Sequence, residues 1–267
     1  MTLSLQQLGS HRWTVPAAAF SVTTADGVRL AGTALQADAP ARPALVLAHG
    51  LMGWHRKPAF ARFAESLSNW FAVYAMDLRG HGASDGVTDY GGAEIEDVAA
   101  VVSLARGRGH ERVATAGMSM GAISVIRHAA LVGGSDAVVA ISSLAWWDWH
   151  DGAHPRAADW MRRRTATPAG RAALRVWGVR LPSDWVRPES PEEVVGKIAP
   201  IPLIVMHGDR DGLFPSSHAE TLLAAAGEPK RLLLGRRGGH AEALITPGFA
   251  SLIGRVTSEA LGVRWSG

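Results

Sequence analysis

Cysteine is absent from this chain of 267 residues, and charged side chains make up only 19% of it. Without thiols the chain forms no disulfide bond and no thiolate metal site. The formal net charge of +3 comes from scattered arginines, and the densest basic run, Arg162 to Arg164, is too short for a strong phosphate-binding patch. We therefore expect no nucleic-acid partner.

Long apolar runs are also missing. No uncharged stretch approaches the roughly 20 residues that a membrane-spanning helix needs, and Met1 to Val15 lacks the apolar centre of a signal peptide. We expect no membrane span and a cytoplasmic protein. Apolar residues still make up 47% of the chain, enough for a sizeable core in a single domain over residues 1–267.

Apolar strand-like runs alternate with amphipathic helices from residue 44 onward. Ala44–Ala48 is a continuous apolar run typical of a strand buried on both faces, and Pro58–Asn69 carries apolar residues at helical spacing. The alternation predicts an α/β fold with a mostly parallel central sheet and helices on both faces. Two short runs around Asp26-Gly27 predict a hairpin before it. The other expected strands are Phe71–Met76, Arg112–Ala116, Ala137–Ser142, Pro202–His207 and Arg231–Leu234, and the other expected helices cover about 92–106, 120–131, 217–226 and a last segment ending near Leu261.

A serine stands at the end of one of these strands. The strand is followed by Gly117-x-Ser119-x-Gly121, and helix-forming residues come directly afterwards. Such a strand–turn–helix presents a serine hydroxyl as a nucleophile, and its glycines leave room where backbone crowds the bend. The pattern alone is weak evidence, because a glycine-rich structural turn can contain a serine too.

A nucleophilic serine requires a base, and an acid that orients the base. In a parallel sheet these groups come from loops at the carboxyl ends of strands. His240 follows the last expected strand and Asp211 follows the strand before it, in the chain order of the Ser-Asp-His triads of α/β-hydrolases. Asp209 in the same loop competes for the role of acid, and Asp148, after an earlier strand, is a further candidate.

The oxyanion that develops during acyl transfer needs two backbone N–H groups about 3 Å away. Met120, directly after the serine at the start of a helix, offers one N–H. Leu51, directly after His49-Gly50 in the loop that follows Ala44–Ala48, offers the second.

Five motifs in this order resemble those of serine α/β-hydrolases, over about residues 20–262. The most similar branch is that of lid-bearing esterases, monoacylglycerol lipases and S33 peptidases. The resemblance implies the α/β-hydrolase fold, a Ser119–Asp211–His240 triad and hydrolysis through an acyl-enzyme. It favours Asp211 over Asp209, because the acid loop of this family usually reads Asp-x-apolar-apolar-Pro. A serine at this position is incompatible with epoxide hydrolases and haloalkane dehalogenases, which carry aspartate there. The motifs are His49-Gly50-Leu51, Asp77-Leu78-Arg79-Gly80-His81-Gly82-Ala83-Ser84, Gly117-Met118-Ser119-Met120-Gly121, Gly208-Asp209-Arg210-Asp211 and Gly239-His240.

Several other polar residues are interpreted as structural. The resemblance implies that His49 and His81 brace the oxyanion loop and the loop after the next strand, and His207, at the end of a buried strand, is expected to be a hydrogen-bonded core histidine. One short stretch of the chain contains two aspartates and two histidines that could bind a metal ion. A metal site is disfavoured there, because no further ligands are evident elsewhere in the sequence and a serine triad needs no metal. We expect neither metal nor cofactor. The residues of that group are Asp148, His150, Asp151 and His154.

The alternation breaks at about residues 143–199, where six of the ten tryptophans lie among arginine, proline and histidine. This length suits two or three helices, so we expect a small helical lid over an apolar substrate pocket. The tryptophans nearest to the site in the sequence are the candidate pocket residues: Trp54, Trp146, Trp147 and Trp149.

The predicted function is that of a carboxylesterase-like serine hydrolase. Its partner is expected to be a small-molecule ester or acyl substrate with an apolar or aromatic part. A thioesterase or acyltransferase, a peptidase and a C–C bond hydrolase remain alternatives on the same triad. A non-catalytic binding protein of the same fold is disfavoured, because such proteins usually lose a member of the triad.

Overall fold

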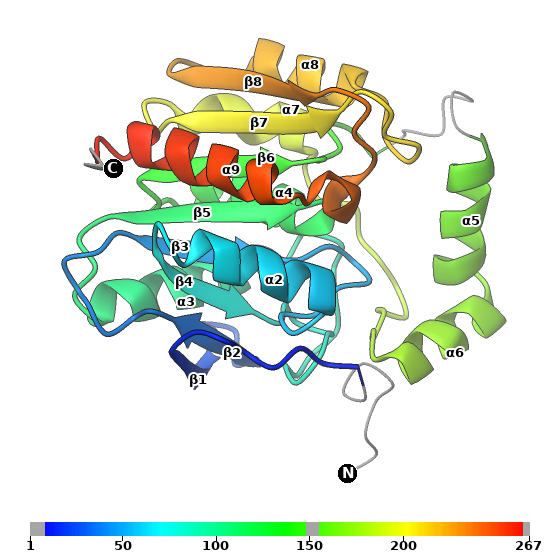
Figure 1. The fold of residues 1–267 in the computed structure, drawn as a ribbon. Helices are drawn as coiled ribbons and strands as arrows, with labels where there is room; N and C mark the ends of the chain where they lie inside the picture. The colour runs from blue at the N-terminus through cyan, green and yellow to red at the C-terminus, as the bar shows by residue number, and fades with distance from the viewer. Residues whose placement is uncertain (1–8, 148–154, 264–267) are drawn as a thin grey trace.

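The computed structural model describes residues 9–147 and 155–263, which are built around one eight-stranded sheet. The strands are β1 (Ala17–Thr23), β2 (Arg29–Leu35), β3 (Ala44–Ala48), β4 (Ala72–Met76), β5 (Val113–Met118), β6 (Ala137–Ile141), β7 (Leu203–Gly208) and β8 (Lys230–Gly235). They lie in the order β1-β2-β4-β3-β5-β6-β7-β8 (Figure 1). β2 pairs antiparallel with β1 and β4, and every other pair is parallel. The predicted hairpin and the mostly parallel sheet are confirmed.

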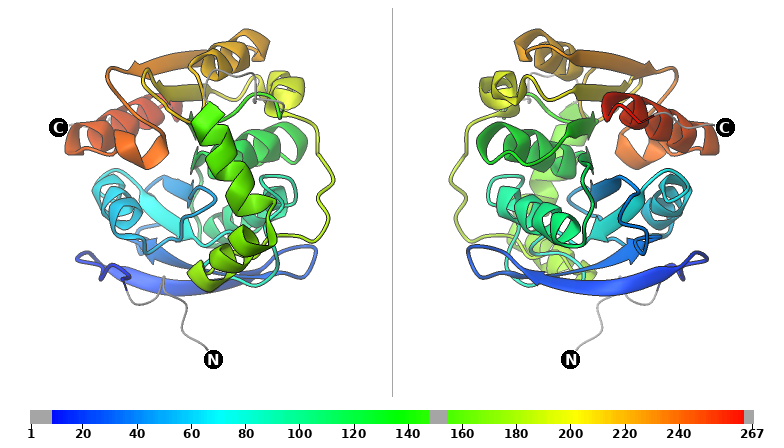
Figure 2. Two further views of the ribbon diagram at one scale, coloured as in Figure 1. Left: turned by 90° about the vertical axis from the view of Figure 1, so that its right-hand side faces the viewer. Right: turned by 90° about the vertical axis from the view of Figure 1, so that its left-hand side faces the viewer.

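Helices cover both faces of the sheet (Figure 2). One face carries α2 (Pro58–Leu67) and α9 (Pro247–Ala260), and the other carries α3 (Glu94–Gly107), α4 (Met120–Leu131), α8 (Ser217–Ala225) and the 3-10 helix η1 (Val195–Ile198). No helix in the described part of the chain is long and apolar enough to cross a bilayer.

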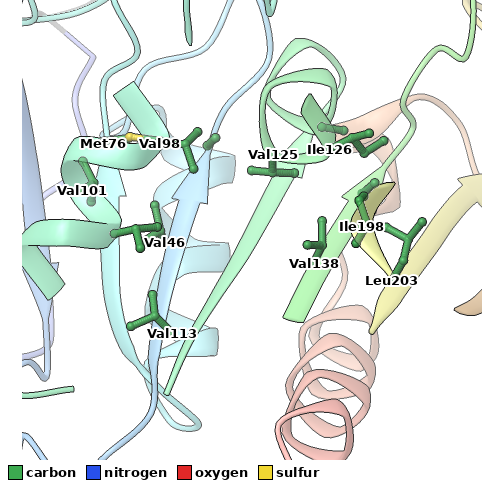
Figure 3. Packing of buried hydrophobic residues seen from close by; sticks show 14 of the residues in the cluster. Val46, Met76, Val98, Val101, Val113, Val125, Ile126, Val138, Ile198 and Leu203 are labelled. Atoms are coloured by element: carbon green, nitrogen blue, oxygen red, sulfur yellow. The ribbon is translucent and has the colours of Figure 1, made fainter. Parts of the chain in front are cut away.

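The core consists of two apolar layers, one on each face of the sheet. Alternate residues of a strand point to opposite faces, so Val46 joins one layer while its neighbours Leu45 and Leu47 join the other. Figure 3 shows Val98 of α3 beside Met76 of the sheet in the first of these layers. Every residue of the five strands β3 to β7 is buried. Because each fully buried aliphatic side chain stabilises the fold by about 1.5–3 kcal/mol, these strands form a rigid base for the loops at their ends.

The connection between β6 and β7, residues 142–202, is called the insertion below. It contains α5 (Pro155–Thr165), α6 (Pro168–Trp177) and the short helix α7 (Pro191–Val194), followed by η1. α6 begins where the Thr167 hydroxyl accepts the N–H of Gly170 and ends at Gly178, whose φ of +105° suits glycine. α5 and α6 lie beyond the carboxyl ends of the parallel strands (Figure 1) and cross in front of that end in the left view of Figure 2.

Candidate active site

Ser119 occupies a strained bend between β5 and α4. Its φ and ψ of +53° and −116° lie outside the regions that residues with a side chain prefer, at a cost of about 1–3 kcal/mol. Its N–H is fixed by the carbonyl of Ile141 at 2.8 Å. A Cβ on Gly121 would lie 2.5 Å from the carbonyl oxygen of Ala48, and one on Gly117 would collide with the backbone of Gly121. The glycines are therefore needed for the backbone to pass so closely on both sides of the serine.

The three residues that were predicted as a triad form one hydrogen-bonded chain. His240 Nε2 lies 2.9 Å from Ser119 Oγ, and His240 Nδ1 lies 2.7 Å from Asp211 Oδ2. Because a carboxylate only accepts, Nδ1 carries the proton and Nε2 presents its lone pair to the serine hydroxyl. This is the arrangement in which an imidazole can remove the serine proton.

Asp211 stays ionised although it is only 4% exposed. Burial alone would raise its pKa, but the hydrogen bond from His240 and the N–H groups of Phe214 and Leu213 outweigh burial and lower the pKa below its usual value. Both N–H groups donate to Oδ1 at 2.9 Å, which leaves Oδ2 for the histidine. Asp209, the competing candidate, is exposed and does not contact His240; its N–H pins the turn to the carbonyl of Gly235 at 3.1 Å.

The loops that carry Asp211 and His240 are held against each other by their backbones. Arg210 N–H donates to the carbonyl of Gly238 at 2.9 Å, and a Cβ on Gly208 would collide with that same loop. Next to His240, Ala241 N–H donates to Ser142 Oγ at 3.0 Å. Ser142 has no place in any recognised motif, so sequence reasoning did not single it out.

The N–H groups of Leu51 and Met120 are the candidate oxyanion donors. Neither donates a hydrogen bond to another described residue. Met120 is the first residue of α4, where backbone N–H groups have no partner within the helix. Gly50 brings the other loop close, since a Cβ at this position would lie 3.2 Å from Ser119 Cβ. Both free donors therefore lie in segments that border the serine.

Two buried histidines hold the loop that contains Leu51, as the resemblance implied. His81 Nε2 lies 2.5 Å from the carbonyl oxygen of Leu51. His49 Nδ1 donates to the carbonyl of Gly50 at 2.8 Å, while its Nε2 accepts the N–H of Leu78 at 3.1 Å. Burial lowers the pKa of His49 to about 3, so this ring remains neutral and keeps its accepting nitrogen. His207 is likewise a buried structural histidine, with Nε2 3.0 Å from the carbonyl oxygen of Phe214.

Two cavities meet at Ser119. The large cavity, about 430 Å³, is mostly apolar and contains Met120 in its wall but not His240. The small cavity, about 200 Å³, contains His240 and is bordered by the ion pair between Lys57 and Glu242 at 2.8 Å. A volume of 430 Å³ is typical of a small-molecule site. The large cavity is lined by Leu51, Tyr90, Ser119, Met120, Ile123, Leu144, Trp147, Met161, Thr165, Ala166, Arg171, Pro182, Ser183, Trp185 and Phe214.

The structure corrects the expected pocket residues. Trp147 lines the large cavity, but Trp146 stacks on His218 with ring centroids 3.9 Å apart, and Trp54 is buried beside Trp177. Both lie near the site in the sequence, but both rings face neighbouring elements instead. Trp149 lies outside the described residues.

Aromatic residues that are distant in the sequence complete the wall of the large cavity. Trp185 makes edge-to-face contacts with Tyr90 and Trp147, with ring centroids 5.4 and 5.3 Å apart. These three rings form one continuous wall. Asp148, His150, Asp151 and His154 lie outside the described part of the chain. Among the described residues, no three acidic or histidine side chains are placed to hold a metal ion.

Comparisons with known proteins agree with this architecture. Residues 45–254 match the model of the alpha/beta hydrolase family. The chain is 27% identical to the uncharacterized protein YfhR of Escherichia coli O157:H7, over 88% of this chain and 76% of that protein. Its fold is similar to the esterase Pf2001 of Pyrococcus furiosus (TM-score 0.75, 21% identity, 95% of this chain and 98% of that one) and to the esterase RhEst1 of Rhodococcus sp. ECU1013 (TM-score 0.68, 20% identity, 91% and 99%). The chain belongs to the alpha/beta hydrolase family.

Proposed function

We propose that this protein is a serine hydrolase that cleaves carboxylic esters with an apolar or aromatic acyl part. The observation that carries the proposal is the hydrogen-bonded chain Asp211–His240–Ser119 beside an apolar cavity of about 430 Å³. The esterases of similar fold are consistent with this chemistry. The insertion serves as the lid over the substrate.

In the proposed reaction, His240 Nε2 takes the hydroxyl proton as Ser119 Oγ attacks the carbonyl carbon. The N–H groups of Leu51 and Met120 bind the resulting oxyanion, each at a worth of about 3 kcal/mol in the transition state. Asp211 stabilises the imidazolium. His240 then returns the proton to the leaving alcohol oxygen, and a water molecule activated by the same histidine releases the acid from Ser119.

The position of His240 decides which end of the ester enters which cavity. The leaving oxygen must come within hydrogen-bond reach of His240 Nε2 to receive its proton. His240 lines the small cavity, whereas the large cavity has Met120 in its wall but not the histidine. The alcohol part therefore leaves through the small cavity, and the acyl chain occupies the large one.

Replacement of the serine tests this proposal. We expect Ser119→Ala to lower kcat for 4-nitrophenyl butanoate by about 10⁴-fold or more, and a fluorophosphonate to label the wild type at Ser119 only. Ser124→Ala is the matched control, since this buried serine one turn along α4 donates to the carbonyl of Met120 and leaves the nucleophile intact. Undiminished turnover in Ser119→Ala, or labelling at another residue, would refute the assignment. Panels of ester, thioester, amide and diketone substrates then separate the bond types.

A further inference from the structure

Arg171 of α6 is the one charged residue among the described residues that line the large cavity. The other residues of the wall are aliphatic, aromatic or small, apart from Thr165 and Ser183 and the Tyr90 and Ser119 hydroxyls. A guanidinium in such surroundings is costly to desolvate unless an acceptor compensates it. We therefore looked for a group that the positive charge of Arg171 could bind in this cavity.

Within the described part of the chain, the Arg171 guanidinium contacts backbone carbonyls and no carboxylate. Nη1 donates to the carbonyl of Thr165 at 3.3 Å, and Nη2 donates to that of Pro182. These bonds use two of the five N–H donors of the group and fix its plane. No other described residue accepts a hydrogen bond from this group, so three N–H donors are left for a ligand.

Tyr90 stands close enough to Arg171 to interact with it electrostatically. Burial raises the pKa of Tyr90 to about 12, so its hydroxyl stays protonated at neutral pH and can donate to an anion. Tyr90 and Arg171 both line the large cavity. One part of this cavity thus combines a cation with a neutral donor.

The surrounding segment is strongly basic. Residues 155–187 contain eight arginines and two aspartates, although the whole chain has a net charge of only +3. One of these charges is paired within the segment, since Arg163 and Asp159 form an exposed ion pair at 2.7 Å. The potential of this segment attracts small anions toward the end of the sheet where Ser119 lies.

We propose that Arg171 makes the large cavity selective for acyl chains that end in a carboxylate. The substrates would be half-esters of dicarboxylic acids, whose ester carbonyl reaches Ser119 while the distal carboxylate binds the guanidinium. The apolar wall accommodates the methylene chain between the two ends, and the planar fork of arginine matches a carboxylate. This inference rests on the proposed esterase function, and it makes Arg171 a specificity-determining residue.

A matched pair of substrates measures this selectivity. 4-Nitrophenyl hexanoate and the mono-4-nitrophenyl ester of adipic acid have the same chain length and leaving group, and differ only in a terminal methyl or carboxylate. We expect the wild type to have the higher kcat/KM for the adipate half-ester. Since a hydrogen bond to a charged group contributes more than a neutral one, Arg171→Gln is expected to lower the adipate-to-hexanoate ratio of kcat/KM by about 10- to 100-fold. Arg171→Lys, which keeps the charge but not the fork, is expected to be intermediate.

Arg175→Gln is the control, because it removes the same charge from the same helix at an exposed position outside the cavity wall. Its ratio is expected to stay within about threefold of the wild type. A wild-type ratio at or below one, or an equal fall in both variants, overturns the role of Arg171. If Arg171→Gln does not fold, product inhibition of the wild type tests the proposal instead. Adipate is expected to inhibit at least tenfold more strongly than hexanoate. Equal inhibition by the two acids overturns the proposal. Failure to hydrolyse either ester would refute the esterase function itself, whereas hydrolysis of hexanoate without preference refutes only the carboxylate site.

Discussion

Ser142 is expected to position the catalytic base, although it touches neither Ser119 nor His240 in any hydrogen bond of the described chain. It directly follows β6, is completely buried and has a φ of +52°. Its Oγ accepts the N–H of Ala241, which itself has a φ of +46°. The hydrogen bond therefore joins two strained residues, one of them next to His240, and holds the histidine loop to an inner strand.

Ser142→Ala removes the acceptor and leaves the Ala241 N–H without a partner in a position that is only 6% exposed. An unsatisfied buried N–H costs about 1–3 kcal/mol, and the loop can regain a partner only by moving. A displacement of about 1 Å at a catalytic group lowers rates about 100-fold. We therefore expect kcat to fall by about 10- to 100-fold, with KM within threefold of the wild type.

Steady-state kinetics with an aryl ester, combined with urea unfolding, tests this expectation. Ser142→Gly should lose the same activity yet be more stable than Ser142→Ala, because glycine adopts positive φ without strain. Ser135→Ala is the matched control at the other end of β6: its buried hydroxyl contacts Thr115 Oγ1 at 3.2 Å, far along the strand from the site. Its stability is expected to fall and its kcat to stay normal. If Ser142→Ala keeps kcat within threefold of the wild type, or if Ser135→Ala loses as much, the positioning role is wrong.

Two further predictions concern buried carboxylates. Asp211→Asn is expected to lower kcat about a thousandfold or more by favouring the wrong tautomer of His240. Asp209→Asn is expected to keep at least a third of the wild-type kcat. Single-turnover acylation rates compare the two variants, and equal losses would contradict the assignment of Asp211 as the acid. Burial would raise the pKa of Asp77, but His55, His49 and a backbone N–H lower it to about 2 from 3.8. A carboxylate whose pKa is lower in the folded state stabilises the fold at pH values above its unfolded-state pKa. This stabilisation is lost as the pH falls toward the folded-state pKa. The free energy of unfolding of Asp77→Asn is thus expected to be about 2 kcal/mol lower than that of the wild type at pH 7. This difference should narrow between about pH 4 and pH 2. A difference that does not change with pH in urea titrations would disprove this.

The sheet and the order of the candidate site residues could be predicted because their signals are local. A continuous apolar run such as Ala44–Ala48 has few alternatives to a central strand, and β3 has those bounds. The bend at Ser119 is indicated by Gly117 and Gly121, where nearby backbone leaves no room for a Cβ atom. Asp211 and His240 follow consecutive strands, so the parallel topology brings them to one edge once the strands are identified.

The walls of the large cavity could not be predicted, since they depend on how the insertion packs. Trp185 and Arg171 are brought to the cavity by tertiary contacts and by backbone carbonyls, neither of which has a periodic signature. Nearness in the sequence favoured Trp146 instead. That residue follows a core strand closely, and its ring turns toward α8, where it stacks on His218.

The proposed base, His240, is likewise held by tertiary contacts rather than by its own strand. His240 follows β8, an edge strand whose residues are all partly or fully exposed, so little apolar burial holds its loop. Three backbone donors compensate: Asp209 and Arg210, both after β7, bind the carbonyls of Gly235 and Gly238, while Ala241 reaches across β7 to Ser142 after β6. Only the last of these contacts ties the histidine loop to a strand beyond its immediate neighbour. Because β6 is completely buried, that contact fixes the loop of His240 to a rigid part of the core. We expect its loss to lower kcat more than it lowers the stability of the fold.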